Sequence, residues 1–209
     1  ISGSVEQFTI LSSFKTPRLS GGPQSIYMHG GNYKELELSL NSEYHDSENP
    51  NSEYTLAFHI AVSQGAQGHA YVPASMLSEN TWHKSAVVWD GEFIKIYVDG
   101  ILATTVEYNI GQGYDWDAAP DGPWLGVAEG SRQYEGNLDE VSFWTTALNA
   151  DEISYYMEFS PSGNDYALST YYNFNEGSGQ LLLDHSGNNN HGVIYGAEWS
   201  DDVPNMDPP

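Results

Sequence analysis

The stretch that decides the fold is WHKSAVVWDGEFIKIYVDGILATTVEY, which spans residues 82–108. Three apolar runs, at residues 82–89, 93–98 and 101–108, are separated by Asp90-Gly91 and Asp99-Gly100. An Asp-Gly pair between apolar runs is a strong hairpin signal, because both residues tolerate the positive φ angles of a tight turn. The segment therefore predicts a meander of three antiparallel strands.

The same period of two occurs elsewhere in the chain. Leu36, Leu38 and Leu40 alternate with polar residues, and so do two further apolar sets: Phe8, Ile10 and Phe14; Leu56, Phe58, Ile60 and Val62. One apolar face per strand indicates antiparallel sheets that cover a core. A short helix is predicted at residues 150–157, where Asn149 and Glu152 can form a capping box. The fold class is therefore an all-β, two-sheet antiparallel sandwich with one short helix.

Length and composition fit a single domain. The chain has 209 residues, enough for one β-sandwich with a well-buried core, and 39% of them are hydrophobic. The absence of cysteine excludes disulfides and thiolate metal sites. We expect one domain over residues 1–200 and a proline-rich tail or linker at 201–209. Three polar loops are expected, at residues 41–53, 111–123 and 158–165.

The charge balance is strongly acidic, with 29 Asp and Glu against 6 Lys and Arg and a formal net charge of −23. Two interpretations stay open: a solvated surface that keeps the protein soluble, or cation binding in a salty or calcium-rich medium. The few basic residues are scattered, so nucleic acids and anionic membranes are poor partners. The longest apolar run is far too short for membrane insertion.

Several motifs together resemble the laminin-G-like and concanavalin-A-like lectin superfamily, pentraxins included. The motifs are NTWHKSAVVWDG (80–91), IKIYVDG (94–100), GNLDEVSFW (136–144), ALNADEI (147–153), YYNFNEGSG (171–179) and DHSGNNNHG (184–192). The resemblance covers essentially the whole chain and implies a jelly-roll sandwich. It implies little about function, since this fold carries lectins, adhesion modules, carbohydrate-binding modules and some hydrolases.

The order of the motifs departs from many bacterial laminin-G-like domains. There the Asp-x-Ser-Gly-x-x-Asn element comes near the start, whereas here it comes last, as the corresponding strands do in pentraxins. We expect these strands to close the same sandwich. The alternative is that they open a following repeat.

The DHSGNNNHG loop is the strongest candidate for a metal site. Calcium prefers six to eight oxygen ligands on a flexible loop, and this loop offers them through Asp184, Ser186, Asn188, Asn190 and the backbone of His191. From the residues alone, an Asn-Gly-rich turn that hydrogen-bonds its own backbone is the more favoured interpretation. The resemblance implies a structural Ca²⁺ there instead, with Asp139 as its second carboxylate.

Ligand contacts are expected in loops. The Tyr114-Asp115-Trp116-Asp117 stretch suits glycan recognition, with the aromatic rings as a stacking platform and the carboxylates as hydroxyl partners. The alternative is a loop folded over its own tryptophan. Matching to pentraxins by order implies that Asn32 and Glu129 also lie near the ligand.

These observations predict a non-catalytic, lectin-like module of a larger secreted or cell-surface protein, stabilised by calcium and binding a glycan, polysaccharide or cell-surface glycoprotein. The alternatives are a protein–protein adhesion module with purely structural calcium and, less favoured, a divergent glycoside hydrolase. The Glu-x-Asp-x-x-Glu strand of laminarinase-type hydrolases does not occur in the sequence. We therefore expect no enzyme activity.

Overall fold

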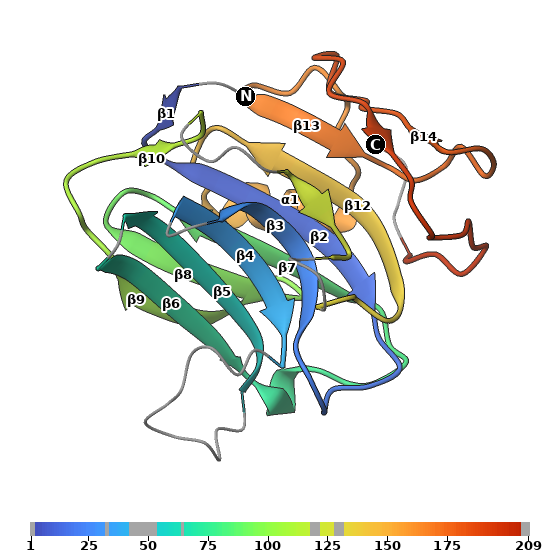
Figure 1. The fold of residues 1–209 in the computed structure, drawn as a ribbon, viewed down its shortest axis with the longest axis horizontal. Coiled ribbons are helices and arrows are strands. Elements are labelled where there is room, and N and C mark those ends of the chain that lie inside the picture. Colours follow the sequence, from blue (N-terminus) through green and yellow to red (C-terminus); the bar gives the residue numbers. More distant parts are fainter. Residues whose placement is uncertain are drawn as a thin grey trace.

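Two antiparallel sheets are stacked face to face (Figure 1). The computed structural model describes residues 3–31, 34–41, 54–63, 65–117, 122–127 and 132–205. The five-stranded sheet has the strand order β11 (Trp124–Leu125), β3 (Gln24–Gly31), β4 (Lys34–Leu40), β5 (Tyr54–Ser63) and β6 (Ala66–Pro73). A 3-10 helix, η2 (Ala74–Met76), follows β6.

The six-stranded sheet contains the predicted meander. Its order is β13 (Leu168–Tyr172), β12 (Asn137–Trp144), β2 (Phe8–Lys15), β7 (His83–Trp89), β8 (Phe93–Val98) and β9 (Ile101–Glu107). Strands β7, β8 and β9 follow one another antiparallel, with the two Asp-Gly pairs at their turns. The prediction of an antiparallel jelly-roll sandwich is confirmed.

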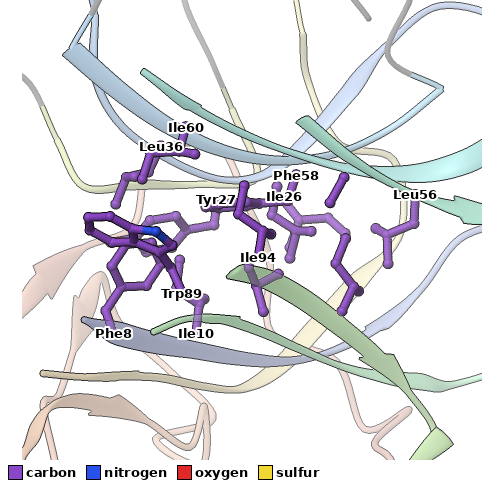
Figure 2. Close-up of a cluster of buried hydrophobic side chains, with 14 of the residues drawn as sticks. Phe8, Ile10, Ile26, Tyr27, Leu36, Leu56, Phe58, Ile60, Trp89 and Ile94 are labelled. Atoms are coloured by element: carbon purple, nitrogen blue, oxygen red, sulfur yellow. The ribbon is translucent and has the colours of Figure 1, made fainter. Parts of the chain in front are cut away.

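The core lies between the two sheets (Figure 2). Phe8, Trp89 and Ile94 reach it from the six-stranded sheet, and Leu36 and Phe58 reach it from the five-stranded sheet. All five side chains are fully buried. Full burial of one large apolar side chain contributes roughly 1.5–3 kcal/mol, so this layer is the main stabilising element of the fold.

Helix α1 (Ala150–Glu158) packs on the outer face of the six-stranded sheet, on the far side of the molecule in Figure 1. Ile153 and Met157 are its buried residues, and they join a second apolar cluster with Leu11, Val88 and Trp144. The Asn149 side chain accepts from two backbone N–H groups, and Glu152 completes the capping box. The predicted helix and its cap are therefore confirmed, and one outer face of the sandwich is occupied by the helix.

The C-terminal motifs join the same sandwich, because β13 is hydrogen-bonded to β12 in the six-stranded sheet. A small hairpin of β14 (Leu181–Leu182) and β15 (Gly192–Val193) follows. Beyond it, Asp202 accepts hydrogen bonds from Lys15 and Trp82, so this part of the tail is fastened to the sheet. No helix of the described residues is long and apolar enough to cross a membrane.

Candidate functional site

The Asp184 loop is held together by its own hydrogen bonds. Asp184 Oδ1 accepts from the backbone N–H groups of Tyr171 and Ser186, both at 2.9 Å. Its Oδ2 accepts from the Ser186 hydroxyl at 2.9 Å and from the Asn190 N–H at 2.8 Å. Burial alone would raise the pKa of the Asp184 carboxyl, but these donors outweigh it and hold the pKa below its usual value.

The other predicted calcium ligands of this loop also form hydrogen bonds within the chain. Asn188 Nδ2 donates to the Ser169 carbonyl at 3.0 Å, and so does Asn190 Nδ2. His191 Nδ1 accepts the Asp184 N–H at 3.0 Å. These contacts favour the interpretation that the loop hydrogen-bonds its own backbone and that of β13.

A calcium ion fits this arrangement poorly. Calcium needs several oxygens that face the ion, whereas both oxygens of Asp184 face N–H or O–H donors of the chain. Across the described residues, no group of three or more His, Asp or Glu side chains is placed to hold a metal ion. We therefore derive no calcium geometry at this loop, and calcium binding stays a prediction.

Asp139 lies on β12 and is not among the hydrogen-bond partners of the Asp184 loop. It is 7% exposed, and its Oδ1 accepts the Glu140 N–H at 2.8 Å. Burial raises the pKa of the Asp139 carboxyl to about 7, with a smaller contribution from the neighbouring Glu140 charge. The carboxylate that contacts β13 here is that of Glu140, which accepts from the Tyr171 hydroxyl at 2.6 Å.

The expected stacking platform at Tyr114 and Trp116 is wrong. Tyr114 begins a short strand, β10 (Tyr114–Asp115), that pairs with β1 (Ser4–Val5), and its side chain is fully buried. Trp116 is 8% exposed, and its ring stacks on His29 with a centroid distance of 3.8 Å. Both rings belong to the core, so the second of the two interpretations of this loop is the correct one.

The flanking carboxylates point the other way. Asp115 and Asp117 are exposed, and Asp117 Oδ2 accepts the Gly3 N–H at 2.9 Å. The segment thus alternates buried aromatic residues with exposed acids, and its aromatic rings are not available to a ligand. Asn32 and Glu129, the two residues matched to pentraxins, lie outside the described residues.

The structure brings a different set of polar side chains together, on the outer face of the five-stranded sheet. The register aligns one residue from each strand in a row across the sheet: Trp124, Met28, Glu37, His59 and His69. Neighbouring residues in the same strands, such as Leu36 and Leu38, are core residues. Since side chains alternate between the two faces of a sheet, the row faces away from the core.

Three hydrogen-bonded or ionic contacts tie this outer face together. His59 Nε2 lies 2.9 Å from Glu35 Oε1, and His59 Nδ1 lies 3.0 Å from His69 Nδ1. Beside them, Arg132 donates to Glu37 at 2.8 Å. The Glu37 side chain is only 3% exposed, and its Oε1 has no hydrogen-bond partner within the described part of the chain. Burial raises the pKa of the Glu37 carboxyl, and Arg132 opposes that effect.

His69 is neutral at physiological pH. The Glu35 carboxylate only accepts, so His59 Nε2 carries its proton toward it. The contact between His59 Nδ1 and His69 Nδ1 uses one proton, which either ring can supply. Burial, with a smaller contribution from the neighbouring His59, lowers the pKa of His69 to about 4. His69 therefore offers a neutral imidazole at neutral pH.

Part of this face is open to solvent. His69 and Tyr71 on β6 and Glu35 on β4 are half-buried, and Gln67 is exposed. The rings of His69 and Tyr71 are nearly parallel, with centroids 6.4 Å apart. At the opposite end of the row Trp124 is 45% exposed. The face thus combines two partly exposed aromatic side chains, Tyr71 and Trp124, with hydrogen-bond donors and acceptors.

Residues 3–154 match the laminin G-type family described as the concanavalin A-like lectin/glucanases superfamily. No curated protein sequence matches the chain. A protein from Bacteroides ovatus, provisionally described as carbohydrate-binding, is similar in structure, with a TM-score of 0.70 and 19% identity. The similarity covers 93% of this chain but only 54% of that one, so this chain spans about half of its relative's length.

Two further solved structures are similar. The CBM40 domain of a Ruminococcus gnavus sialidase, bound to α2,3-sialyllactose, has a TM-score of 0.56 and 19% identity over 74% of this chain and 84% of that one. Domain 4 of an extracellular arabinanase from Geobacillus stearothermophilus, in complex with arabinotriose, has a TM-score of 0.54 and 14% identity over 76% of this chain and 68% of that one. At such low identity these similarities concern the fold.

Proposed function

The chain belongs to the concanavalin A-like lectin/glucanases superfamily, and on that premise we propose that it is a carbohydrate-binding module that holds a glycan on the outer face of its five-stranded sheet. The observation that carries the proposal is the polar row across that face. Its carboxylate, Glu37, is buried and paired with Arg132. The partly exposed rings of Trp124 and Tyr71 lie at one end of the row and beside the other. A buried ion pair is weak evidence for stability, so the Arg132–Glu37 pair on an outer face favours a binding role.

The partly exposed side chains of β4 and β6 on this face suit a sugar ring. The C–H face of a pyranose stacks on an aromatic side chain, while its hydroxyls both donate and accept hydrogen bonds. Tyr71 offers the ring, Glu35 offers a carboxylate acceptor, and His69 offers a neutral imidazole beside it. Gln67 adds an amide that both donates and accepts. Glu35 and His69 are held in place by His59, so this site is preorganised.

Charge narrows the class of ligand. A formal net charge of −23 repels anionic polysaccharides over long range. Among the described ion pairs of this face, Arg132 is the one permanently charged cation, and Glu37 neutralises it. We therefore propose a neutral glycan as the ligand.

Several further predictions accompany the proposal. The two similar structures solved with arabinotriose and α2,3-sialyllactose support glycan binding by this fold. A non-catalytic module is supported by the missing Glu-x-Asp-x-x-Glu strand in the sequence. A secreted or cell-surface location fits the extracellular arabinanase that shares the fold. Calcium binding remains a prediction of the family resemblance.

The test is a glycan array followed by calorimetric titration with the best neutral oligosaccharide. Loss of one stacking contact of about 0.5–1.5 kcal/mol corresponds to an affinity roughly 2- to 10-fold weaker. We expect that loss for Tyr71→Ala and a similar one for His69→Ala. Tyr195→Ala is the matched control, because Tyr195 is 84% exposed and lies outside the five-stranded sheet.

Two results would overturn the proposal. One is an array on which no neutral glycan binds, which would favour a protein–protein adhesion module. The other is binding that Tyr71→Ala and His69→Ala leave as strong as the control variant does. The second result would mean that the protein binds a glycan on another surface.

A further inference from the structure

We propose that a cleft on the opposite side of the molecule is a second binding site, for one neutral sugar residue or another small polyol. The cleft lies beside β12 and β13 and has a volume of about 310 Å³, within the usual size of small-molecule sites. Its lining comes from four segments far apart in sequence: Glu140; Ser160, Pro161, Ser162 and Gly163; Tyr171, Asn173 and Asn175; and His185. The proposal does not rest on the outer face of the five-stranded sheet.

The Glu140 carboxylate is aimed into this cleft by a strained backbone. Glu140 has a φ of 51°, a left-handed conformation that residues other than glycine rarely adopt. It lies where the β12–β2 register shifts between Asp139 and Ser142. Such strain inside a strand tends to occur where a side chain contacts a ligand.

The carboxylate is held in one position. Glu140 Oε2 accepts a hydrogen bond from the Tyr171 hydroxyl at 2.6 Å. That contact orders the carboxylate and the aromatic ring together. The two side chains therefore form a fixed corner of the cleft, with an acceptor beside an aromatic surface.

The opposite wall is also rigid. Gly163 has a φ of 84°, and a Cβ at this position would collide with the His185 carbonyl oxygen. The loop can approach His185 this closely only with glycine. Asp165 accepts from both the N–H and the hydroxyl of Ser162, at 2.7 and 3.0 Å. The cleft is thus formed before any ligand arrives, which lowers the cost of binding.

The lining favours hydroxyl groups over ions. Asn173 and Asn175 provide amides that donate and accept, Ser160 provides a hydroxyl, and Glu140 provides an acceptor. A sugar hydroxyl both donates and accepts, so it can use this mixture fully. A metal ion would need more carboxylates than the single one in the lining, and an anion would face Glu140.

The test uses backbone amide shifts of the whole chain during titration with glucose, galactose, mannose and myo-inositol as separate probes. We expect at least one probe to shift the amides of residues 160, 162–163, 171–175 and 185. Glu140→Gln keeps the size of the side chain but removes its charge, and we expect affinity about tenfold weaker. Asn173→Ala, at a half-buried position, should weaken binding independently.

Glu92→Gln is the matched control, because it removes a carboxylate from an exposed turn away from the cleft. The proposal is overturned if none of the four probes shifts these amides, or if Glu140→Gln and Asn173→Ala bind as the control does. It is equally overturned if calcium alone, and no probe, produces the shifts. Tyr71→Ala should leave the cleft shifts intact, so failure of the first site and failure of the second give different results.

Discussion

Replacing Asp184 by alanine tests how the DHSGNNNHG loop is held. Asp184 accepts four hydrogen bonds, three from backbone N–H groups and one from the Ser186 hydroxyl. One hydrogen bond to a charged group contributes about 1.5–3 kcal/mol, but the four bonds share one carboxylate and are not additive. We expect Asp184→Ala to lower the free energy of unfolding by about 3 kcal/mol.

For a chain of this length, that loss corresponds to a fall in Tm of roughly 6–12 °C. The assay is differential scanning calorimetry of the wild type and the variant, each in saturating calcium and in excess chelator. We expect the variant to melt lower by the same amount in both buffers. Asp184→Asn keeps one acceptor oxygen, so its Tm should lie between those of the wild type and Asp184→Ala.

Asp201→Ala is the control, because it removes the same charge from an exposed position and should leave the Tm unchanged. Our reasoning is refuted if chelator alone lowers the Tm of the wild type by the amount that Asp184→Ala does, and has no effect on the variant. That pattern is the mass-action signature of calcium bound to the native state through Asp184. The hydrogen bonds described here would then be secondary.

Three further predictions concern stability. Trp116→Ala should lower the free energy of unfolding by about 3–5 kcal/mol, as expected for a core tryptophan. Chemical denaturation measures this loss, and a loss under about 1 kcal/mol would show that the ring is dispensable to the core. Asn149→Ala should cost about 1 kcal/mol by removing the helix cap, and an unchanged melt would contradict the capping role. Because the pKa of His69 is lowered to about 4, the stability that its neutral form provides is complete above about pH 6.5 and is lost as the pH falls toward 4. His69→Gln should remove that part of the pH dependence of stability. If the wild type and His69→Gln have identical profiles of unfolding free energy against pH, the prediction is wrong.

The meander and the helix were predictable because their signals are local. Asp90-Gly91 and Asp99-Gly100 fix two tight turns whatever the rest of the chain does, and the structure has the three strands that they join. Asn149 and Glu152 satisfy backbone N–H groups within their own helix. Neither feature depends on which distant strand lies alongside.

Trp116 was misjudged for the opposite reason. Its position in a polar stretch suggests an exposed loop, yet Tyr-Asp-Trp-Asp has the same period of two that identifies strands elsewhere in this chain. Pairing with β1 buries one side of that alternation against His29, which lies far away in sequence. The signal was present, but the segment is too short for the pattern to be decisive.

The polar row on the five-stranded sheet could not be predicted from single strands. Glu37, His59 and His69 each alternate with core residues, so each has the sequence signature of an ordinary solvent-facing residue. Only the register of β4, β5 and β6 places them side by side. Two histidines at outward positions of consecutive strands were the one hint that the sequence offered.

The most direct measurement of the central claim is a crystal structure of the protein with the neutral oligosaccharide that the array selects. We predict a sugar ring over Tyr71, with hydroxyls within hydrogen-bond distance of Glu35 and His69. An ordered oligosaccharide bound elsewhere, with the outer face of the five-stranded sheet bare at saturating ligand, would contradict the account.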